Sequence, residues 1–185
     1  HVLDYHRFGS DTLLDFYRSE YEVIRRHSPA VPITTNFMTM SQFRFLDYHD
    51  WAPHQDVVST DHYVVNSLEH PQAELSFHGD LTRGLAGRRP WMLMEHSTSA
   101  VNWQHVNPAK VPGGTILDSL AHVARGADTL GFFQWRQSRS GSEKFHSALV
   151  PHAGEDSDRF REVCELGAIA DRLGEILGSR VDADV

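Results

Sequence analysis

Residues 90–96, Pro-Trp-Met-Leu-Met-Glu-His, form an apolar run that ends in a single carboxylate, Glu95. Arginines and a proline precede the run and a Ser/Thr-rich loop follows it, which predicts a buried strand of a parallel sheet. Ligands of α/β barrels and open α/β sheets bind at the carboxyl ends of the strands, so Glu95 is a candidate catalytic residue. A glutamate that caps a helix or pairs with an arginine is the alternative interpretation, and for one isolated residue it is the more common one.

Helices and strands are predicted to alternate on both sides of this run. Apolar residues at spacings of three and four indicate helices, and short apolar or β-branched runs indicate strands. The predicted helices cover residues 10–26, 71–85, 115–126 and 160–176, with one short helix in the connection 38–55, and the predicted strands cover residues 31–37, 56–63, 91–95 and 129–136. This alternation predicts an α/β fold of four parallel strands with crossover helices, which is half of an eight-unit (β/α)8 barrel.

Several residues carry more specific expectations about packing. Trp91 lies within its strand, so we expect it in the core rather than in a binding site. Thr115 and Asp118 fit the Ser/Thr-x-x-acid capping box at the start of a helix, with Leu117 on the buried face. Cys164, the only cysteine, cannot form an internal disulfide and falls inside the apolar pattern of the last helix. It is therefore predicted to be a small core residue in a reducing compartment.

Composition excludes several classes of protein. The chain has 185 residues, 40% of them hydrophobic and 23% charged, which is ordinary for a globular domain. A net charge of −8 without a basic stripe argues against nucleic acid as a partner. No apolar run approaches the roughly 20 residues of a membrane span, and no secretory signal opens the chain. We therefore expect a cytoplasmic protein, and because both ends look cut, a piece of a longer one.

Polar or aromatic side chains are predicted at the end of every strand, namely Asn36 and Phe37, Asp61 and Tyr63, Glu95, and Trp135 and Arg136. The carboxyl ends of parallel strands meet at one edge of a sheet, so these groups are expected to converge. The loops after the third and fourth strands add Trp103, Glu143 and His146. Aromatic rings beside carboxylate and imidazole groups suit a sugar, which has apolar C–H faces and a rim of hydroxyls.

Other kinds of chemistry find no support in the motifs. The 13 histidines are scattered without a His-Glu-x-x-His motif or companion cysteines, so we expect no metal site. No Gly-x-Ser-x-Gly elbow indicates a serine hydrolase. Gly113-Gly114 lacks the lysine of a phosphate-binding loop, and no cofactor is expected.

The motifs together closely resemble the catalytic domain of glycoside hydrolase family 42 β-galactosidases. The matching segments are Trp91-Met-Leu-Met-Glu95, Val101-Asn-Trp103, Thr35-Asn-Phe-Met38, Ser59-Thr-Asp-His-Tyr63, and Phe132-Phe-Gln-Trp-Arg-Gln-Ser-Arg139 with Glu143-Lys-Phe-His146. They occur in the family's order over nearly the whole chain. The resemblance implies the C-terminal half of a TIM barrel, strands five to eight, in an enzyme that hydrolyses terminal β-D-galactosyl residues with retention of configuration.

The resemblance also implies roles for individual residues. Glu95 occupies the position of the family's nucleophile on strand seven. Tyr63 matches the strand-six tyrosine whose hydroxyl supports that nucleophile. Four further residues match groups that line or hydrogen-bond the galactose subsite, namely Trp103, Phe133, Glu143 and His146. The family often forms trimers, which implies a homo-oligomer here.

One family feature is missing from this chain. The family's general acid/base is a glutamate that follows an asparagine near the end of strand four, and no Asn-Glu pair occurs in these 185 residues. Retaining hydrolysis needs two carboxyl groups about 5–5.5 Å apart. We therefore expect the chain alone to be inactive, with residues 1–180 forming half of the barrel domain and residues 181–185 beginning a linker to a following domain.

Two other functions remain open on the sequence. The chain could be a non-catalytic carbohydrate-binding or interaction half barrel. It could also belong to a related clan enzyme that acts on another β-glycoside, and the sequence does not distinguish galactose from arabinopyranose or identify the aglycone. An upstream Asn-Glu pair within four more strand-helix units would favour the β-galactosidase.

Overall fold

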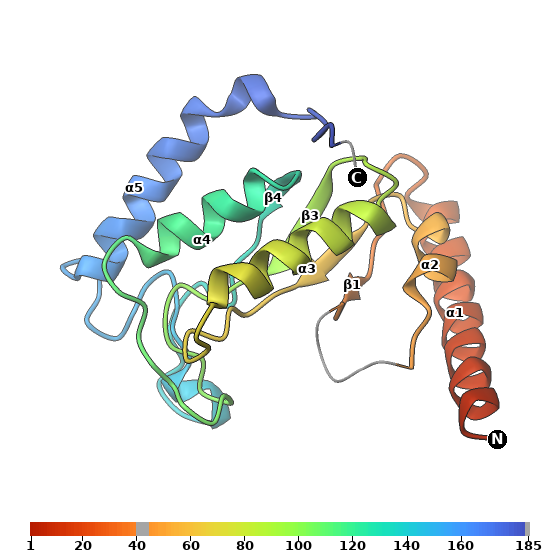
Figure 1. The fold of residues 1–185 in the computed structure, drawn as a ribbon, viewed down its shortest axis with the longest axis horizontal. Coiled ribbons are helices and arrows are strands. Elements are labelled where there is room, and N and C mark those ends of the chain that lie inside the picture. Colours follow the sequence, from red (N-terminus) through yellow and green to blue (C-terminus); the bar gives the residue numbers. More distant parts are fainter. Residues whose placement is uncertain (40–44, 184–185) are drawn as a thin grey trace.

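The computed structural model describes residues 1–39 and 45–183, in which helices and strands alternate as predicted (Figure 1). Part of the predicted connection 38–55 and the last two residues of the predicted linker 181–185 lie outside the described residues. The elements are α1 (Val2–His27), β1 (Asn36–Phe37), α2 (Tyr48–Trp51), η1 (Ala52–His54), β2 (Ser59–Asp61), α3 (Pro71–Leu85), β3 (Trp91–Glu95), α4 (Gly114–Val123), β4 (Ala127–Leu130), η2 (Ser142–Phe145), α5 (Asp158–Arg172) and η3 (Gly174–Ile176).

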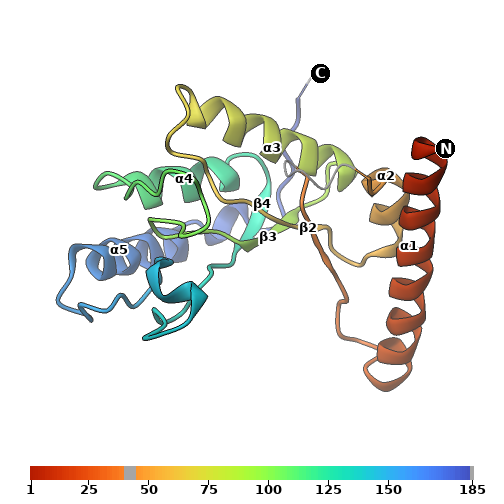
Figure 2. The ribbon, with the colours of Figure 1, turned by 90° about the horizontal axis from the view of Figure 1, so that it is seen from below.

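The four strands form one parallel sheet in the order β1-β2-β3-β4. Each strand therefore pairs with the next one along the chain, which is the arrangement that successive strand-helix units produce. α3 contacts α4, and α4 contacts α5. α1 and α5 lie at opposite ends of the sheet (Figures 1 and 2). The predicted α/β fold of four parallel strands with crossover helices is confirmed.

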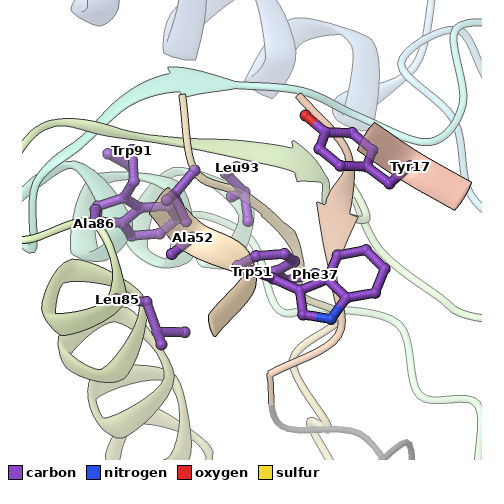
Figure 3. Packing of buried hydrophobic residues seen from close by; sticks show 10 residues of the cluster. Tyr17, Phe37, Trp51, Ala52, Leu85, Ala86, Trp91 and Leu93 are labelled. Atoms are coloured by element: carbon purple, nitrogen blue, oxygen red, sulfur yellow. The ribbon is translucent and has the colours of Figure 1, made fainter. Parts of the chain in front are cut away.

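The hydrophobic core joins the sheet to the first two helices. Trp91, Leu93 and Phe37 supply the strand side chains, and each is at most 1% exposed. Tyr17 of α1 and Trp51 of α2 pack against them (Figure 3). Trp91 is thus a core residue, as predicted, and its ring Nε1 donates a hydrogen bond to the Arg125 carbonyl at 3.0 Å.

A polar cluster attaches α1 to the amino ends of the strands. The Asp56 carboxylate accepts a hydrogen bond from the Tyr21 hydroxyl at 2.9 Å and one from the Ile33 amide at 2.6 Å. Arg25 forms an ion pair with the same carboxylate and donates to Tyr21. Because Asp56 precedes β2 by three residues, this cluster lies at the edge of the sheet opposite the strand ends that carry Asp61 and Glu95.

The strand and helix bounds differ from the prediction at several places. α1 begins at Val2, eight residues before the predicted start, and β1 is limited to Asn36–Phe37. β4 covers Ala127–Leu130 rather than residues 129–136. The reason is Gly131, whose amide donates to the Leu93 carbonyl at 2.7 Å and where an added Cβ would collide with the Met94 carbonyl oxygen. The chain crosses β3 closely at this glycine and then continues as a loop.

The predicted capping box of α4 is wrong. The helix begins at Gly114 with Gly113 as its N-cap, and the Thr115 amide of its first turn donates to Glu162 Oε1 of α5 at 2.9 Å rather than to Asp118 or a local side chain. The Thr115 hydroxyl instead donates to the Thr98 carbonyl at 2.6 Å, and Asp118 forms an ion pair with Lys110 at 2.9 Å. Leu117 is 57% exposed. The face of α4 that packs against the sheet is therefore polar, because its side chains find partners from other parts of the chain.

The predicted burial of Cys164 is also wrong, because the side chain is exposed on α5. The buried residue of this helix is Leu166. An apolar spacing identifies one face of a helix but not which face the rest of the fold covers. Among the described residues, no helix combines the length and the apolar character that crossing a bilayer would require.

Candidate active site

Two adjacent strand ends bring a tyrosine to the carboxylate of Glu95. Asp61 at the end of β2 pairs in register with Glu95 at the end of β3. Beyond this pair the His62 amide donates to the Glu95 carbonyl at 2.9 Å, so the ladder continues for one more residue. Tyr63 then places its hydroxyl 2.5 Å from Glu95 Oε2 and donates a hydrogen bond to it. The candidate nucleophile is thereby held by a side chain of the neighbouring strand.

The surroundings of Tyr63 keep its hydroxyl protonated. Burial raises the pKa of Tyr63, and the hydrogen bond to Glu95 and the charges of the nearby carboxyl groups raise it further. A hydroxyl with a raised pKa remains a hydrogen-bond donor over the range in which proteins are folded. Tyr63 can therefore orient Glu95 without becoming a base itself.

Asp61 is a second carboxyl group at this edge of the sheet. Asn36 donates a hydrogen bond from Nδ2 to Asp61 Oδ2, and Oδ1 is buried without a partner among the residues described. Burial raises the pKa of Asp61 to about 7, and the charge of Glu95 raises it while the Asn36 bond opposes the change. The raised pKa favours the uncharged form of Asp61, which limits the repulsion that Glu95 experiences.

Aromatic rings surround the Tyr63–Glu95 pair. Trp103 and His146 both meet the Tyr63 ring edge-on, with centroid distances of 5.3 and 5.6 Å. Phe133 meets the His146 ring in the same way at 5.0 Å. Trp103 is 59% exposed, so one face of its indole is open to a ligand. A partly exposed indole beside a carboxylate is suited to the apolar face of a sugar ring.

The loops that follow β3 and β4 form the rest of the site. They lie close together at the lower edge of the molecule in Figure 1 and are linked by a hydrogen bond from Asn102 Nδ2 to the Ser142 carbonyl at 2.7 Å. The Glu143 carbonyl accepts from the His146 amide at 3.1 Å. Glu143 Oε2 and His146 Nε2 are buried and have no hydrogen-bond partner among the described residues. The described residues therefore leave the hydrogen-bonding capacity of both atoms unused.

The structure brings together all six residues that the sequence assigned to the site, namely Glu95, Tyr63, Trp103, Phe133, Glu143 and His146. Asn36 and Asp61 lie at the same edge, as predicted. Trp135 and Arg136 do not belong to a strand end. Trp135 is 71% exposed in the loop after β4, and Arg136 forms an isolated bridge with Val150.

Sequence reasoning missed a buried polar cluster behind the strand ends. His62, His78 and His122 place ring nitrogens within 4.8 Å of one another. His62 Nδ1 lies 3.1 Å from His122 Nε2, and its Nε2 lies 3.0 Å from a Glu74 carboxylate oxygen. The partners come from the residue after β2, from α3 and from α4, and no local spacing joins them. An unusual density of histidine in predicted core elements was the only available signal.

The orientation of the rings in this cluster favours hydrogen bonds over a metal ion. The rings of His62 and His78 are stacked, 3.9 Å between centroids and 10° between planes. A metal lies about 2.0–2.1 Å from an imidazole nitrogen, in the plane of the ring, so one ion cannot satisfy two parallel rings at this separation. His78 Nε2 also contacts the Thr60 hydroxyl at 3.2 Å. Binding a metal would require these rings to turn and to break their present hydrogen bonds.

We therefore predict that Zn²⁺ does not stabilise this chain. One equivalent of Zn²⁺ at pH 7.5 should leave the thermal unfolding midpoint unchanged, because a ligand stabilises a protein only if it binds the folded state. The measurement is a thermal melt with and without the ion, together with elemental analysis of the purified chain. Stoichiometric zinc that is lost in His122→Gln would contradict the prediction.

The same histidines should make the fold sensitive to acid. Burial, together with the neighbouring His62, Lys110 and Arg125, lowers the pKa of His122 to about 2. The unfolded chain binds a proton below about pH 6.5, whereas folded His122 does not, so the stability that depends on its neutral form is lost as the pH falls. At pH 5.5 this one residue should cost about 1.4 kcal/mol of the free energy of unfolding.

The test compares the wild-type chain with His122→Gln, in which the amide can still reach His62 Nδ1. Urea unfolding at pH 7.5 and 5.5 gives the loss of free energy for each protein. The loss should be smaller in the variant by about 1.4 kcal/mol, because one titrating group has been removed. Equal losses would show that His122 becomes protonated within the folded chain.

The fold and the sequence match proteins of one family. A family model described as β-galactosidase, that of glycoside hydrolase family 42, matches residues 1–173. A β-galactosidase of an Arthrobacter species is 55% identical over 181 residues, which are 98% of this chain and 26% of the relative. The β-galactosidase BbgII of Bifidobacterium bifidum is 49% identical over 174 residues, or 94% of this chain and 25% of the relative.

Solved structures give the same result. Gan42B, a GH42 β-galactosidase from G. stearothermophilus, superposes with a TM-score of 0.93 at 38% identity, over 98% of this chain and 28% of its own. The cold-adapted β-galactosidase from Rahnella sp. R3 also gives a TM-score of 0.93, at 40% identity, over 98% of this chain and 27% of its own. The chain thus spans about a quarter of the length of the Arthrobacter and Bifidobacterium relatives.

Proposed function

The chain belongs to glycoside hydrolase family 42, the β-galactosidase family, and we propose from this that it supplies strands five to eight of the catalytic barrel in a longer, retaining β-galactosidase. The observation that carries the proposal is the 2.5 Å hydrogen bond from the Tyr63 hydroxyl to Glu95 at the carboxyl edge of the sheet. The substrate class is a terminal β-D-galactosyl residue. Below, the full-length protein is the polypeptide that contains residues 1–185 together with the remaining strands of the barrel.

Glu95 is the nucleophile in this proposal. One carboxylate oxygen attacks the anomeric carbon, the bond to the leaving-group oxygen breaks, and a galactosyl ester of Glu95 forms. The proton that the leaving oxygen takes up comes from a carboxylic acid in the other half of the barrel. Water then attacks the ester with the same group as base, which releases galactose with its original anomeric configuration and restores the Glu95 carboxylate.

The remaining residues of the site bind the sugar. Trp103 packs on the face of the galactose ring, because its indole is partly exposed next to Tyr63. Glu143 and His146 hold sugar hydroxyls through the buried atoms that have no partner among the described residues. Phe133 packs against His146 and fixes the direction of its imidazole. Buried polar atoms without partners favour a ligand that supplies hydroxyls, because an unmade hydrogen bond in a buried site is costly.

The finer assignments have weaker support and remain part of the proposal. We infer a cytoplasmic homo-oligomer, a trimer by resemblance to the family, that needs no cofactor and binds neither nucleic acid nor membrane. The net charge of −8 argues against nucleic acid, and the orientation of the buried histidine rings argues against a metal cofactor. Residues 1–180 form the half barrel, and the residues that follow begin a linker.

The test is the stereochemistry of hydrolysis. The full-length protein is mixed with 4-nitrophenyl β-D-galactoside, and proton NMR follows the first sugar released. β-Galactose as the initial product supports the retaining mechanism, and α-galactose contradicts it. Binding of galactose without hydrolysis would instead support the non-catalytic alternative, and faster hydrolysis of another β-glycoside would indicate a related enzyme of the same clan.

A further inference from the structure

Lys110, in the loop between β3 and α4, is a buried cation behind the candidate site. Its side chain is 1% exposed, and its Nζ lies 2.9 Å from Asp118 Oδ2, 2.9 Å from the Ser97 carbonyl and 3.2 Å from His96 Nε2. An ammonium group has three protons to donate, and each of these contacts takes one. Each proton of this buried ammonium group thus has an acceptor, which indicates a specific arrangement rather than incidental packing.

The contacts of His96 determine which ring nitrogen carries the proton. His96 Nδ1 lies 3.0 Å from the carbonyl oxygen of His62, which can only accept, so Nδ1 is the donor. Nε2 then carries the lone pair that accepts from Lys110. Burial lowers the pKa of His96, and the charge of Lys110 lowers it further. The ring is therefore neutral and held in a single tautomer.

His96 and His62 are also the residues beside the candidate catalytic pair. His96 directly follows Glu95, and His62 directly precedes Tyr63. The His62 amide donates to the Glu95 carbonyl at 2.9 Å, while the His62 carbonyl accepts from the His96 ring. Both hydrogen-bonding groups of the His62 backbone are thus tied to the segment that carries Glu95. A shift of His96 would change the separation between the Tyr63 hydroxyl and the Glu95 carboxylate.

We propose that His96 and Lys110 are positioning residues for the Tyr63–Glu95 pair, with Lys110 fixing the His96 tautomer that ties the two strand ends together. The proposal rests on the proposed function, and neither residue contacts the substrate. Asp118 of α4 belongs to the same device, because it accepts the third proton of the buried ammonium. A displacement of about 1 Å at a nucleophile can reduce turnover by about 10²-fold, so such a device can control kcat.

Two amide substitutions at His96 separate positioning from stability. In His96→Asn the side-chain N–H lies near the position of Nδ1, so the bond to the His62 carbonyl can survive. In His96→Gln the amide reaches the position of Nε2 and faces Lys110, which leaves the His62 carbonyl without its donor. Both variants remove the imidazole from the same buried place and create a cavity of similar kind.

We expect kcat of the full-length His96→Gln variant to fall by about 10- to 100-fold with KM nearly unchanged, and that of His96→Asn to fall by less than about fivefold. Rates are corrected for the folded fraction measured by circular dichroism. Equal kcat values for the two variants would overturn the proposal, as would a change confined to KM. A wild-type protein without galactosidase activity would instead refute the proposed function, on which this inference rests.

Lys110 needs a paired substitution, because removing the cation alone leaves Asp118 as a buried unpaired charge. Lys110→Met with Asp118→Asn removes both charges and the donor to His96 Nε2. We expect kcat to fall by about tenfold with KM retained. The control is Tyr21→Phe, which removes a hydrogen bond to Asp56 at the opposite edge of the sheet and should leave kcat unchanged. A double variant that matches this control in kcat would overturn the role of Lys110.

Discussion

Glu95→Gln in the full-length protein should reduce turnover by on the order of 10⁴- to 10⁶-fold while galactose still binds. The amide has nearly the same shape as the carboxylate and can still accept the hydrogen bond from Tyr63. It lacks the negative charge that attacks the anomeric carbon, so the galactosyl ester cannot form. Steady-state hydrolysis of 4-nitrophenyl β-D-galactoside gives kcat, and calorimetric titration with galactose measures binding.

Glu143→Gln is the matched control for this variant. Glu143 is proposed to hold a sugar hydroxyl in both the ground state and the transition state, so its loss should weaken binding and turnover together. A second variant, Glu95→Ala, opens space for azide, which should attack from the face that Glu95 occupied and give an α-linked galactosyl azide. Hydrolysis of an activated aryl β-galactoside by Glu95→Gln at near the wild-type rate would show that Glu95 is not the nucleophile.

The parts of the site that could be predicted from sequence are those that depend on strand polarity. A buried apolar run that stops at Glu95 indicates both a strand and the direction in which it ends. Because every strand in the sheet runs in the same direction, the polar residues at 36, 61 and 63 had to lie at the same edge. No side-chain geometry was needed to predict that Tyr63 and Glu95 share this edge, whereas the contact between them was implied only by the resemblance to the family.

The parts that could not be predicted depend on partners far apart in the sequence. His62 and His122 are 60 residues apart, and Lys110 finds its acceptors on two different elements. Sequence reasoning identifies the buried face of a helix by its apolar residues. For that reason it predicted Leu117 on the buried face of α4. On the observed polar face, Thr115, Asp118 and His122 each have a partner from another part of the chain, and such partners are not visible in helical spacing.

A further error concerned the fourth strand. The apolar and aromatic residues 129–136 have the composition of a strand, yet β4 ends at Leu130. Composition does not show that Gly131 approaches the Met94 carbonyl so closely that no side chain fits. The loop that begins there carries Phe133 back to the site, where its amide donates to the His96 carbonyl at 3.0 Å. Because β4 ends at Leu130, the residues that follow can form the loop that brings Phe133 to the site.

Residues 1–185 alone should show no measurable β-galactosidase activity. Without a proton donor on the leaving oxygen, attack at the anomeric carbon loses general-acid help worth typically about 10²–10⁴-fold. In the proposed function the other half of the barrel also contributes contacts to the sugar, so the two losses should multiply. A 2,4-dinitrophenyl galactoside has a good leaving group and needs little acid assistance. Its hydrolysis therefore reports the loss of sugar contacts separately from the loss of the proton donor. We expect this substrate to remain unhydrolysed as well, because the binding site for the sugar is incomplete.

The measurement compares the isolated chain with the same chain carrying Glu95→Gln, which defines the background for contaminating enzymes. Activity of the wild-type chain above this background would contradict the prediction, and if it extended to substrates whose leaving group needs acid assistance it would require a proton donor within residues 1–185. Asp61 is the group to examine in that case, because burial raises its pKa to about 7 and it pairs in register with Glu95. Loss of that activity in Asp61→Asn would place both carboxyl groups of a retaining mechanism on neighbouring strands of this half barrel, whereas equal rates in the wild-type and Glu95→Gln chains would show that Glu95 supports no turnover without the strands outside it.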